Sequence, residues 1–195
     1  MSTTAGLSMN ATELEASHRA ALGWEAYLAT DPAKAAAWRA VYEQAPLTPG
    51  QERLVGGFAR DMRVLCLSGI WCGDCAQQGP LIQRIAEASP RIDLKWCDRD
   101  ACPDLAGRLA INDGKRVPMV VFMAEDYEPV SVMGDRTLSR YRALAARALG
   151  AACPLPGAPV PAEEFAATRQ EWLDEFERVH LLLRLSGRLR EKHGD

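Results

Sequence analysis

Residues 68–75 read SGIWCGDC and decide how the rest of the chain is interpreted. The apolar run from Arg63 to Ser68 has the length of a buried β-strand, and the stretch from Cys72 to Ala88 has the pattern of a helix. Cys72 therefore stands where a strand passes into a helix. Unpaired backbone N–H groups and the positive end of the helix dipole favour a thiolate at such a position.

The places of the two cysteines in this stretch predict different roles for them. Cys72, at the helix entrance, is expected to be exposed and ionisable, and hence to be the attacking nucleophile. Cys75, one turn further on, is expected to be shielded and to resolve the mixed disulfide. Gly73 lets the backbone close tightly enough for the two sulfurs to bond. We therefore predict a catalytic Cys72–Cys75 pair.

Outward from this motif, strand and helix patterns alternate. Further strands are predicted at Ile92 to Cys97, Val117 to Met123 and Pro129 to Met133, and further helices at Pro103 to Leu109 and Leu138 to Leu149. The resulting order, β-α-β-α-β-β-α, predicts an α/β fold with a mixed central sheet that begins with parallel strands and ends with a hairpin.

Added helices are predicted on both sides of this unit. Thr12 and Glu15 have the spacing of a capping box for a first helix that extends towards Leu28. Thr30-Asp31-Pro32 and Thr48-Pro49 have the residue types that begin helices. We divide the chain into a helical N-terminal extension (1–61), an α/β domain (62–150), a proline-rich linker (151–160) and a long C-terminal helix (161–195).

The composition excludes several classes of function. The chain has 195 residues, with 23 basic and 26 acidic side chains and a net charge of −3, and it lacks the basic face that nucleic-acid binding requires. The sequence contains no apolar run of the roughly 18 residues that span a membrane, and its first residues do not resemble a signal peptide. We expect a cytoplasmic protein, in which six cysteines serve as redox groups, metal ligands or small core residues.

Three features together carry a resemblance to the thioredoxin superfamily. They are the Trp71-Cys72-Gly73-Asp74-Cys75 motif, Pro80 in the following helix, and Val117-Pro118 at the start of the third strand. The resemblance extends from about Met62 to Leu149. More narrowly, the chain resembles a bacterial thioredoxin-like branch with a WCGDC motif and helical extensions, through Arg99-Asp100, Asn112-Asp113-Gly114 and Gly134-Asp135-Arg136.

This resemblance implies a thioredoxin-like fold and a thiol–disulfide oxidoreductase. It implies that Pro118 is a cis-proline facing the cysteines, that Arg116 and Val117 offer backbone groups to a substrate, and that Trp71 helps to dock it. The substrate would be a disulfide-containing protein or small molecule. An external thiol reductant or reductase would supply the electrons without a bound cofactor, and the chain would act as a monomer or dimer.

Three positions depart from the usual thioredoxin pattern. Asp74 replaces a proline, and its charge is expected to oppose ionisation of Cys72. Cys66 stands where a buried aspartate assists the resolving thiol in the family. Arg116 replaces a small residue, and we expect its guanidinium to attract the charge of the Cys72 thiolate.

The remaining cysteines allow other interpretations. Cys97 ends a predicted strand and Cys102 precedes a predicted helix, so a second thiol pair is possible at the active edge. We favour the simpler interpretation of one packed cysteine and one surface thiol. A zinc site needs four ligands, which would require these two cysteines to approach Cys72 and Cys75, and we predict no metal site.

A second class of function also fits the sequence. The helical extensions of a thioredoxin-fold adaptor would bind a partner protein, and its thiols would only sense oxidation. Turnover in a disulfide-reduction assay distinguishes the enzyme from this redox sensor.

Overall fold

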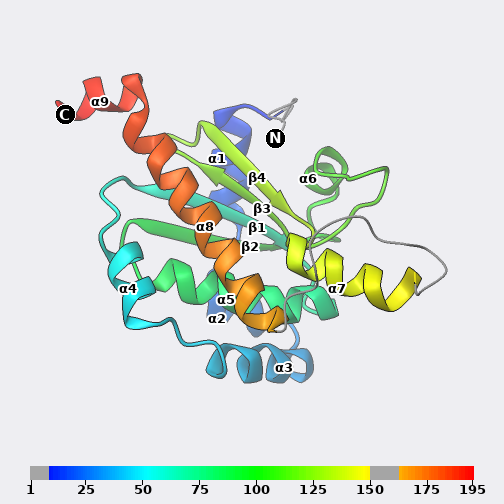
Figure 1. Ribbon diagram of the computed structural model, residues 1–195. Helices are drawn as coiled ribbons and strands as arrows, with labels where there is room; N and C mark the ends of the chain where they lie inside the picture. The colour runs from blue at the N-terminus through cyan, green and yellow to red at the C-terminus, as the bar shows by residue number, and fades with distance from the viewer. Residues whose placement is uncertain (1–8, 150–162) are drawn as a thin grey trace.

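The computed structural model describes residues 9–149 and 163–195, in which four strands form one mixed sheet (Figure 1). The strands are β1 (Met62–Ser68), β2 (Ile92–Asp98), β3 (Met119–Met123) and β4 (Pro129–Gly134). Their order across the sheet is β2-β1-β3-β4. β1 pairs in parallel with β2, whereas the β1–β3 and β3–β4 pairs are antiparallel. The predicted mixed sheet with a hairpin finish is confirmed.

Helices surround this sheet and extend it at both ends of the chain. They are α1 (Ala11–Ala20), α2 (Trp24–Leu28), α3 (Pro32–Glu43), α4 (Pro49–Gly56), α5 (Gly73–Glu87), α6 (Pro103–Arg108), α7 (Leu138–Leu149), α8 (Glu164–Leu185) and α9 (Gly187–His193). The added helices at both termini were predicted and are confirmed. In the part of the chain that the structure describes, no helix is both long and apolar enough to cross a lipid bilayer.

Opposite faces of the sheet are covered by different helices. Phe122 of β3 packs edge-on against Phe176 of α8, with ring centres 5.0 Å apart. On the same face, Nε1 of Trp96 in β2 donates to the Gln83 side chain of α5 at 3.0 Å. Figure 1 shows α8 crossing the front of the sheet and α1 behind it. The strands are therefore buried from both sides, which accounts for their almost continuous apolar runs.

An aromatic cluster joins the N-terminal helices to the edge strand β2. Trp24, Tyr27, Trp38 and Trp96 have ring centres 5.5 to 5.8 Å apart, and all but Trp24 are fully buried. The chain between α1 and α2 also forms a backbone bridge to β2, in which the N–H groups of Leu22 and Trp96 each donate to the other's carbonyl at 2.8 Å. Aromatic pairs of this kind add to the hydrophobic gain of burial.

The first helix begins two residues earlier than predicted. Its N-cap is Asn10, whose side chain accepts from the N–H of Glu13, and Glu13 returns a bond to the Asn10 N–H. Thr12 and Glu15 have the right spacing for a capping box, but Asn10 offers a cap that is at least as strong and starts the helix first. The predicted extension towards Leu28 is also wrong, because the bridge at Leu22 separates α1 from α2.

The predicted single C-terminal helix is divided in two. Ser186 adopts extended dihedral angles, and its side chain accepts from the N–H of Leu189, so that it caps α9. Serine is a preferred N-cap because its oxygen satisfies a free N–H group at the helix start. The predicted proline-rich linker at 151–160 lies outside the described residues.

A glycine in α5 allows the helix to approach α3 closely. A Cβ atom at Gly79 would overlap the ring of Trp38. We expect Gly79→Ala to lower the free energy of unfolding by about 1–3 kcal/mol, since overpacking forces side chains and backbone to shift. Urea unfolding followed by circular dichroism measures this change.

The matched control for this prediction is Gly107→Ala in α6. A Cβ there has open space, so alanine is expected to be neutral or to stabilise by about 0.5–1 kcal/mol. Equal unfolding free energies for the two variants would contradict the close packing of Trp38 on α5.

Candidate active site

The two cysteines of the motif lie at the entrance of α5. Cys72 is the N-cap residue of this helix, and its N–H donates to the Gly69 carbonyl at 2.9 Å. Its own carbonyl accepts from the N–H of Ala76 at 2.9 Å, the first bond of the helix. Cys72 is half-buried, whereas Cys75 in the first turn has no exposed surface. Cys72 is therefore the more accessible of the two thiols.

The environment of Cys72 favours its thiolate. A hydrogen bond from the Cys75 thiol lowers the pKa of Cys72 to about 6, against an ordinary value of 9.0. Partial burial acts in the opposite direction, but bonds from the backbone N–H groups of Cys75 and Asp74 add to the lowering. Burial and the bond to Cys72 raise the pKa of Cys75. At neutral pH the pair thus holds one thiolate and one thiol.

The segment before β3 faces this pair. The peptide bond between Val117 and Pro118 is cis. The Sγ atom of Cys72 lies 3.9 Å from the Val117 carbonyl oxygen, and both Val117 and Pro118 are buried. The third strand begins at Met119 rather than at Val117, because proline has no N–H to contribute to a ladder. This loop forms one wall beside the sulfur of Cys72.

The guanidinium of Arg116 lies beside a buried carboxylate. Its Nη1 atom lies 3.7 Å from Oδ2 of Asp135, a carboxylate that is 3% exposed. Charges that water does not reach are screened weakly, so a carboxylate in such a place attracts a nearby guanidinium strongly. Arg116 therefore forms an ion pair with Asp135, and the attraction of its guanidinium for the charge of the Cys72 thiolate stays a prediction.

The carboxylate of Asp74 is held by two arginines from the other end of the domain. Nη2 of Arg136 lies 2.5 Å from Oδ2, and Nη2 of Arg140 lies 2.7 Å from Oδ1. Partial burial alone would raise the pKa of Asp74, but the bonds from these arginines outweigh it and lower the pKa below its ordinary value. The two arginines thus offset part of the negative charge beside Cys72, which still acts to raise the pKa of that thiol.

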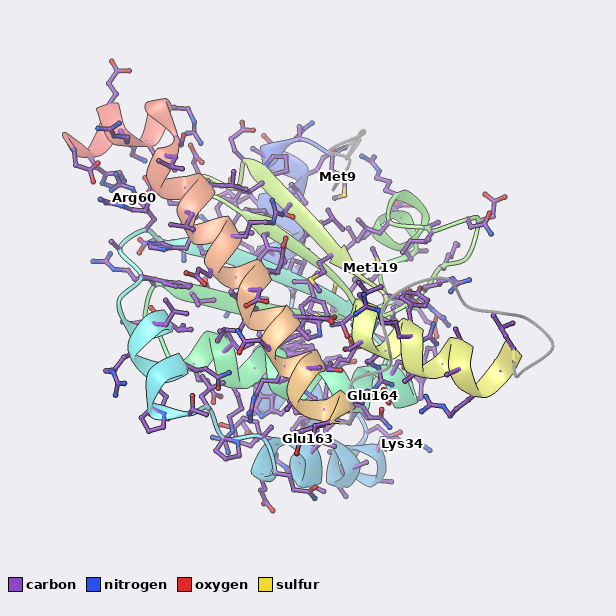
Figure 2. The ribbon with its side chains drawn as sticks, in the orientation of Figure 1. Met9, Lys34, Arg60, Met119, Glu163 and Glu164 are labelled. Carbon is purple, nitrogen blue, oxygen red and sulfur yellow. The ribbon has the colours of Figure 1, made fainter. Side chains whose placement is uncertain are left out.

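Arg140 also connects Asp74 to α8. Nη1 of Arg140 lies 3.3 Å from Oε1 of Glu164, and Arg147 of α7 lies 3.4 Å from the other oxygen of that carboxylate. Figure 2 shows Glu164 at the start of α8, beside α7. Charge compensation at the cysteine motif therefore depends on the packing of the C-terminal helices.

The loop between β4 and α7 is tied to α5 by a buried amide. Nε2 of Gln78 donates to the Asp135 carbonyl at 3.0 Å, and its Oε1 accepts from Nε1 of Trp172 in α8 at 3.2 Å. Nη1 of Arg136 lies 2.9 Å from the Asp135 carboxylate, which also accepts from the Tyr141 hydroxyl. These bonds orient Arg136 towards Asp74.

Trp71 and Trp38 frame the loop that precedes Cys72. The ring of Trp71 is 45% exposed, and the guanidinium carbon of Arg99 lies 4.5 Å from its centre. Nε1 of the buried Trp38 donates to the Ile70 carbonyl at 3.0 Å. Trp71 thus presents an aromatic surface next to Cys72, supported by a cation–π contact, while Trp38 holds the loop from inside.

Sequence reasoning missed several residues that shape this site. The sequence patterns gave no functional role to Trp38, Gln78 or Arg140. The polar group of a buried tryptophan or glutamine needs a hydrogen-bond partner, but the sequence does not show which residue provides it. Of the residues that shape the site beyond the cysteine motif, Asp135 and Arg136 were named in advance, as part of the Gly134-Asp135-Arg136 segment that the family resemblance pointed to.

The other predicted sulfur residues lie nearby. Cys66 is fully buried in β1, where burial raises the pKa of its thiol, so it cannot replace a carboxylate as a proton acceptor. Cys97 lies near the end of β2, and Cys102 directly precedes α6. Among residues 9–149 and 163–195, no three His, Cys, Asp or Glu side chains form a group suited to a metal ion.

Charge compensation of Asp74 predicts how Cys72 titrates. In an Arg140→Gln variant one cation is lost, so the negative charge of Asp74 is expected to raise the pKa of Cys72 above 6. Asp74→Asn removes the repulsion and is expected to lower that pKa. The rate of iodoacetamide modification of Cys72 as a function of pH, followed in the peptide 64–84, measures both shifts.

Arg147→Gln is the matched control, since Arg147 is an arginine of α7 that is 64% exposed and contacts Glu164. Its titration curve should coincide with that of the unsubstituted chain. If neither Arg140→Gln nor Asp74→Asn moved the curve, the charge of Asp74 would have no influence on Cys72.

Comparisons with known proteins agree with this geometry. A family model described as thioredoxin matches residues 21–146. A putative thioredoxin 2 of Streptomyces coelicolor is 34% identical over 55 residues, which cover 28% of this chain and 39% of that protein. Thioredoxin-1 of Saccharomyces cerevisiae is 28% identical over 78 residues, which cover 40% of this chain and 73% of that protein.

A solved structure shares the fold over most of the chain. It is a protein of unknown function from Pseudomonas aeruginosa, which superimposes with a TM-score of 0.66 over 88% of this chain and 96% of that one, at 15% identity. At this identity the likeness concerns the fold alone.

Proposed function

The chain belongs to the thioredoxin family, and from this premise we propose that it is a thiol–disulfide oxidoreductase that uses Cys72 and Cys75. The observation that carries the proposal is the place of Cys72 at the start of α5 beside the fully buried Cys75, where the pKa of Cys72 is lowered to about 6 and that of Cys75 is raised. A thiolate is the form that attacks a disulfide, and a neighbouring thiol is what resolves the product.

In the proposed reaction, the Cys72 thiolate attacks one sulfur of a substrate disulfide. The other substrate sulfur leaves as a thiolate and takes up a proton. Cys75 then gives up its proton and attacks the Cys72 sulfur, which releases the second substrate thiol and leaves a Cys72–Cys75 disulfide. An external thiol reductant or reductase restores the two thiols.

The walls of the site support binding of an extended substrate segment. The N–H of Arg116 donates to the Gly114 carbonyl at 2.8 Å, so its carbonyl is the backbone group that we propose for a substrate strand. The Val117 carbonyl already lies beside Cys72. The exposed ring of Trp71, the residue before Cys72, offers an apolar surface. The substrate class is a disulfide-containing protein or small molecule.

Insulin reduction in the presence of dithiothreitol tests this proposal. Repeated turnover, with many insulin molecules reduced by each chain, is expected for the enzyme. Oxidation of Cys72 and Cys75 by one equivalent of disulfide without turnover would instead support a redox sensor. That alternative draws on the apolar side chains that α8 leaves exposed, Leu181 and Leu185, which are 50% and 75% accessible.

A further inference from the structure

Two further cysteines approach each other at the end of β2. The N–H of Cys102 donates to the carbonyls of Asp98 at 3.0 Å and Arg99 at 3.3 Å, so the chain turns back after the strand. This turn brings the side chain of Cys102 back towards Cys97, close enough for each thiol to shift the pKa of the other. Cys97 also lies 3.8 Å from the Cys66 carbonyl oxygen, which holds its sulfur at the strand end.

The two thiols differ in the same way as Cys72 and Cys75. Cys97 is 7% exposed, whereas Cys102 is only partly buried. The bond from Cys97 lowers the pKa of Cys102 to about 7, although partial burial and the charge of Asp98 oppose this. The bond to Cys102 and burial raise the pKa of Cys97. One accessible thiolate is therefore paired with one shielded thiol.

This pair lies on the same edge of the sheet as the first. Because β1 and β2 are parallel, with Leu67 opposite Cys97, the segments that follow the two strands leave the sheet at one end. The N–H of Arg99 donates to the Ser68 carbonyl at 2.8 Å, and the guanidinium of Arg99 covers Trp71. A disulfide that reaches Trp71 and Cys72 thus also comes close to the turn that carries Cys102.

We propose that Cys97 and Cys102 form a second redox-active dithiol, which is oxidised reversibly to a disulfide by thiol–disulfide exchange. Cys102 attacks one sulfur of a disulfide compound, and the other sulfur leaves as a thiolate and is protonated. Cys97 then loses its proton and attacks the Cys102 sulfur, releasing the second thiol. In total, two protein thiols are oxidised and one disulfide is reduced to two thiols.

The test uses the unsubstituted chain in mixtures of reduced and oxidised glutathione, followed by alkylation and tryptic digestion. Cleavage after Lys95, Arg99 and Arg108 means that a Cys97–Cys102 disulfide links peptides 96–99 and 100–108. A Cys72–Cys75 disulfide stays within peptide 64–84, so the two pairs are read separately. We expect the linked peptides to appear as the oxidised fraction rises and to disappear again on reduction.

Two results would overturn the proposal. In one, Cys97 and Cys102 remain alkylated at every glutathione ratio. In the other, Cys102 accumulates as a mixed disulfide with glutathione, because Cys97 fails to resolve it. Cys102→Ser provides a further check, since Cys97 should then remain a free thiol in the same mixtures. Cys102 is partly exposed, so this variant is expected to keep the far-UV circular dichroism of the unsubstituted chain.

The number of disulfides that one fully reduced chain can reduce tests whether the second pair adds to the proposed function. This part of the inference rests on that function. After reduction and removal of the reductant, the unsubstituted chain should reduce two equivalents of oxidised glutathione. A Cys97→Ser/Cys102→Ser variant should reduce one. If Cys72 and Cys75 were inert, that variant would reduce none, while the linked peptides would still form in the unsubstituted chain. If only the second pair failed, the unsubstituted chain would reduce one equivalent and form no linked peptides.

Discussion

A Cys72→Ser variant is expected to lose disulfide-reductase turnover by at least about 10³-fold, down to the rate of dithiothreitol alone. The reason is the state of the attacking atom. The Cys72 thiol has a pKa of about 6 and is ionised at neutral pH, whereas a serine hydroxyl in the same place stays protonated and is a poor nucleophile towards sulfur. Insulin reduction, followed by turbidity, measures the loss.

The comparison for this result is Cys153→Ser, which removes a cysteine outside both the motif and the matched residues 21–146. Its turnover should equal that of the unsubstituted chain. Since Cys72 is half-buried, the urea midpoint of Cys72→Ser should also remain close to the original. A Cys72→Ser variant with undiminished turnover would show that another thiol starts the reaction.

A Cys75→Ser variant is expected to form a mixed disulfide with its substrate that is not resolved. Cys75 is fully buried behind Cys72, so its removal leaves the attacking thiolate in place and takes away the thiol that releases the product. Turnover should fall about as far as in Cys72→Ser, while each chain retains one covalently bound substrate. Non-reducing electrophoresis and intact mass spectrometry detect this species.

Comparison of Cys75→Ser with Cys75→Ala separates two contributions of Cys75. Both variants lack the resolving sulfur and should trap substrate. The serine hydroxyl can still donate to the Cys72 thiolate, whereas alanine cannot, so only Cys75→Ala is expected to raise the pKa of Cys72. If substrate were released at the normal rate from either variant, Cys75 would not be the resolving thiol.

The order of the central strands and helices could be predicted from the sequence because each of them is encoded locally. The apolar run of Val64–Leu67 before the cysteine motif identifies β1, and the pattern after Cys72 identifies α5. Boundaries were less predictable where two signals competed. Asn10 and Thr12 both suit a helix start, and only the folded chain shows that Asn10 caps α1.

Contacts between distant residues were not predictable in the same way. Arg116 is close to the cis-proline in sequence, which suggested that it attracts the charge of the Cys72 thiolate, but only the fold shows its ion pair with the nearly buried carboxylate of Asp135. The repulsion between Asp74 and Cys72 was foreseen from their proximity. The compensation of this charge by Arg136 and Arg140 was not foreseen, since those residues follow β4 and are distant from Asp74 in the sequence.

By itself the sequence determined the α/β order, the junction of strand and helix at Cys72, and the presence of a thiol pair one helical turn apart. Backbone preferences and hydrophobic periodicity act over a few residues, so these features can be read from short segments. Only the tertiary structure decided which charges surround the thiolate and which thiols meet. Hydrogen bonds act over about 3 Å and charge interactions are strong only at short range, and only folding brings Arg140 to Asp74 and Cys102 towards Cys97.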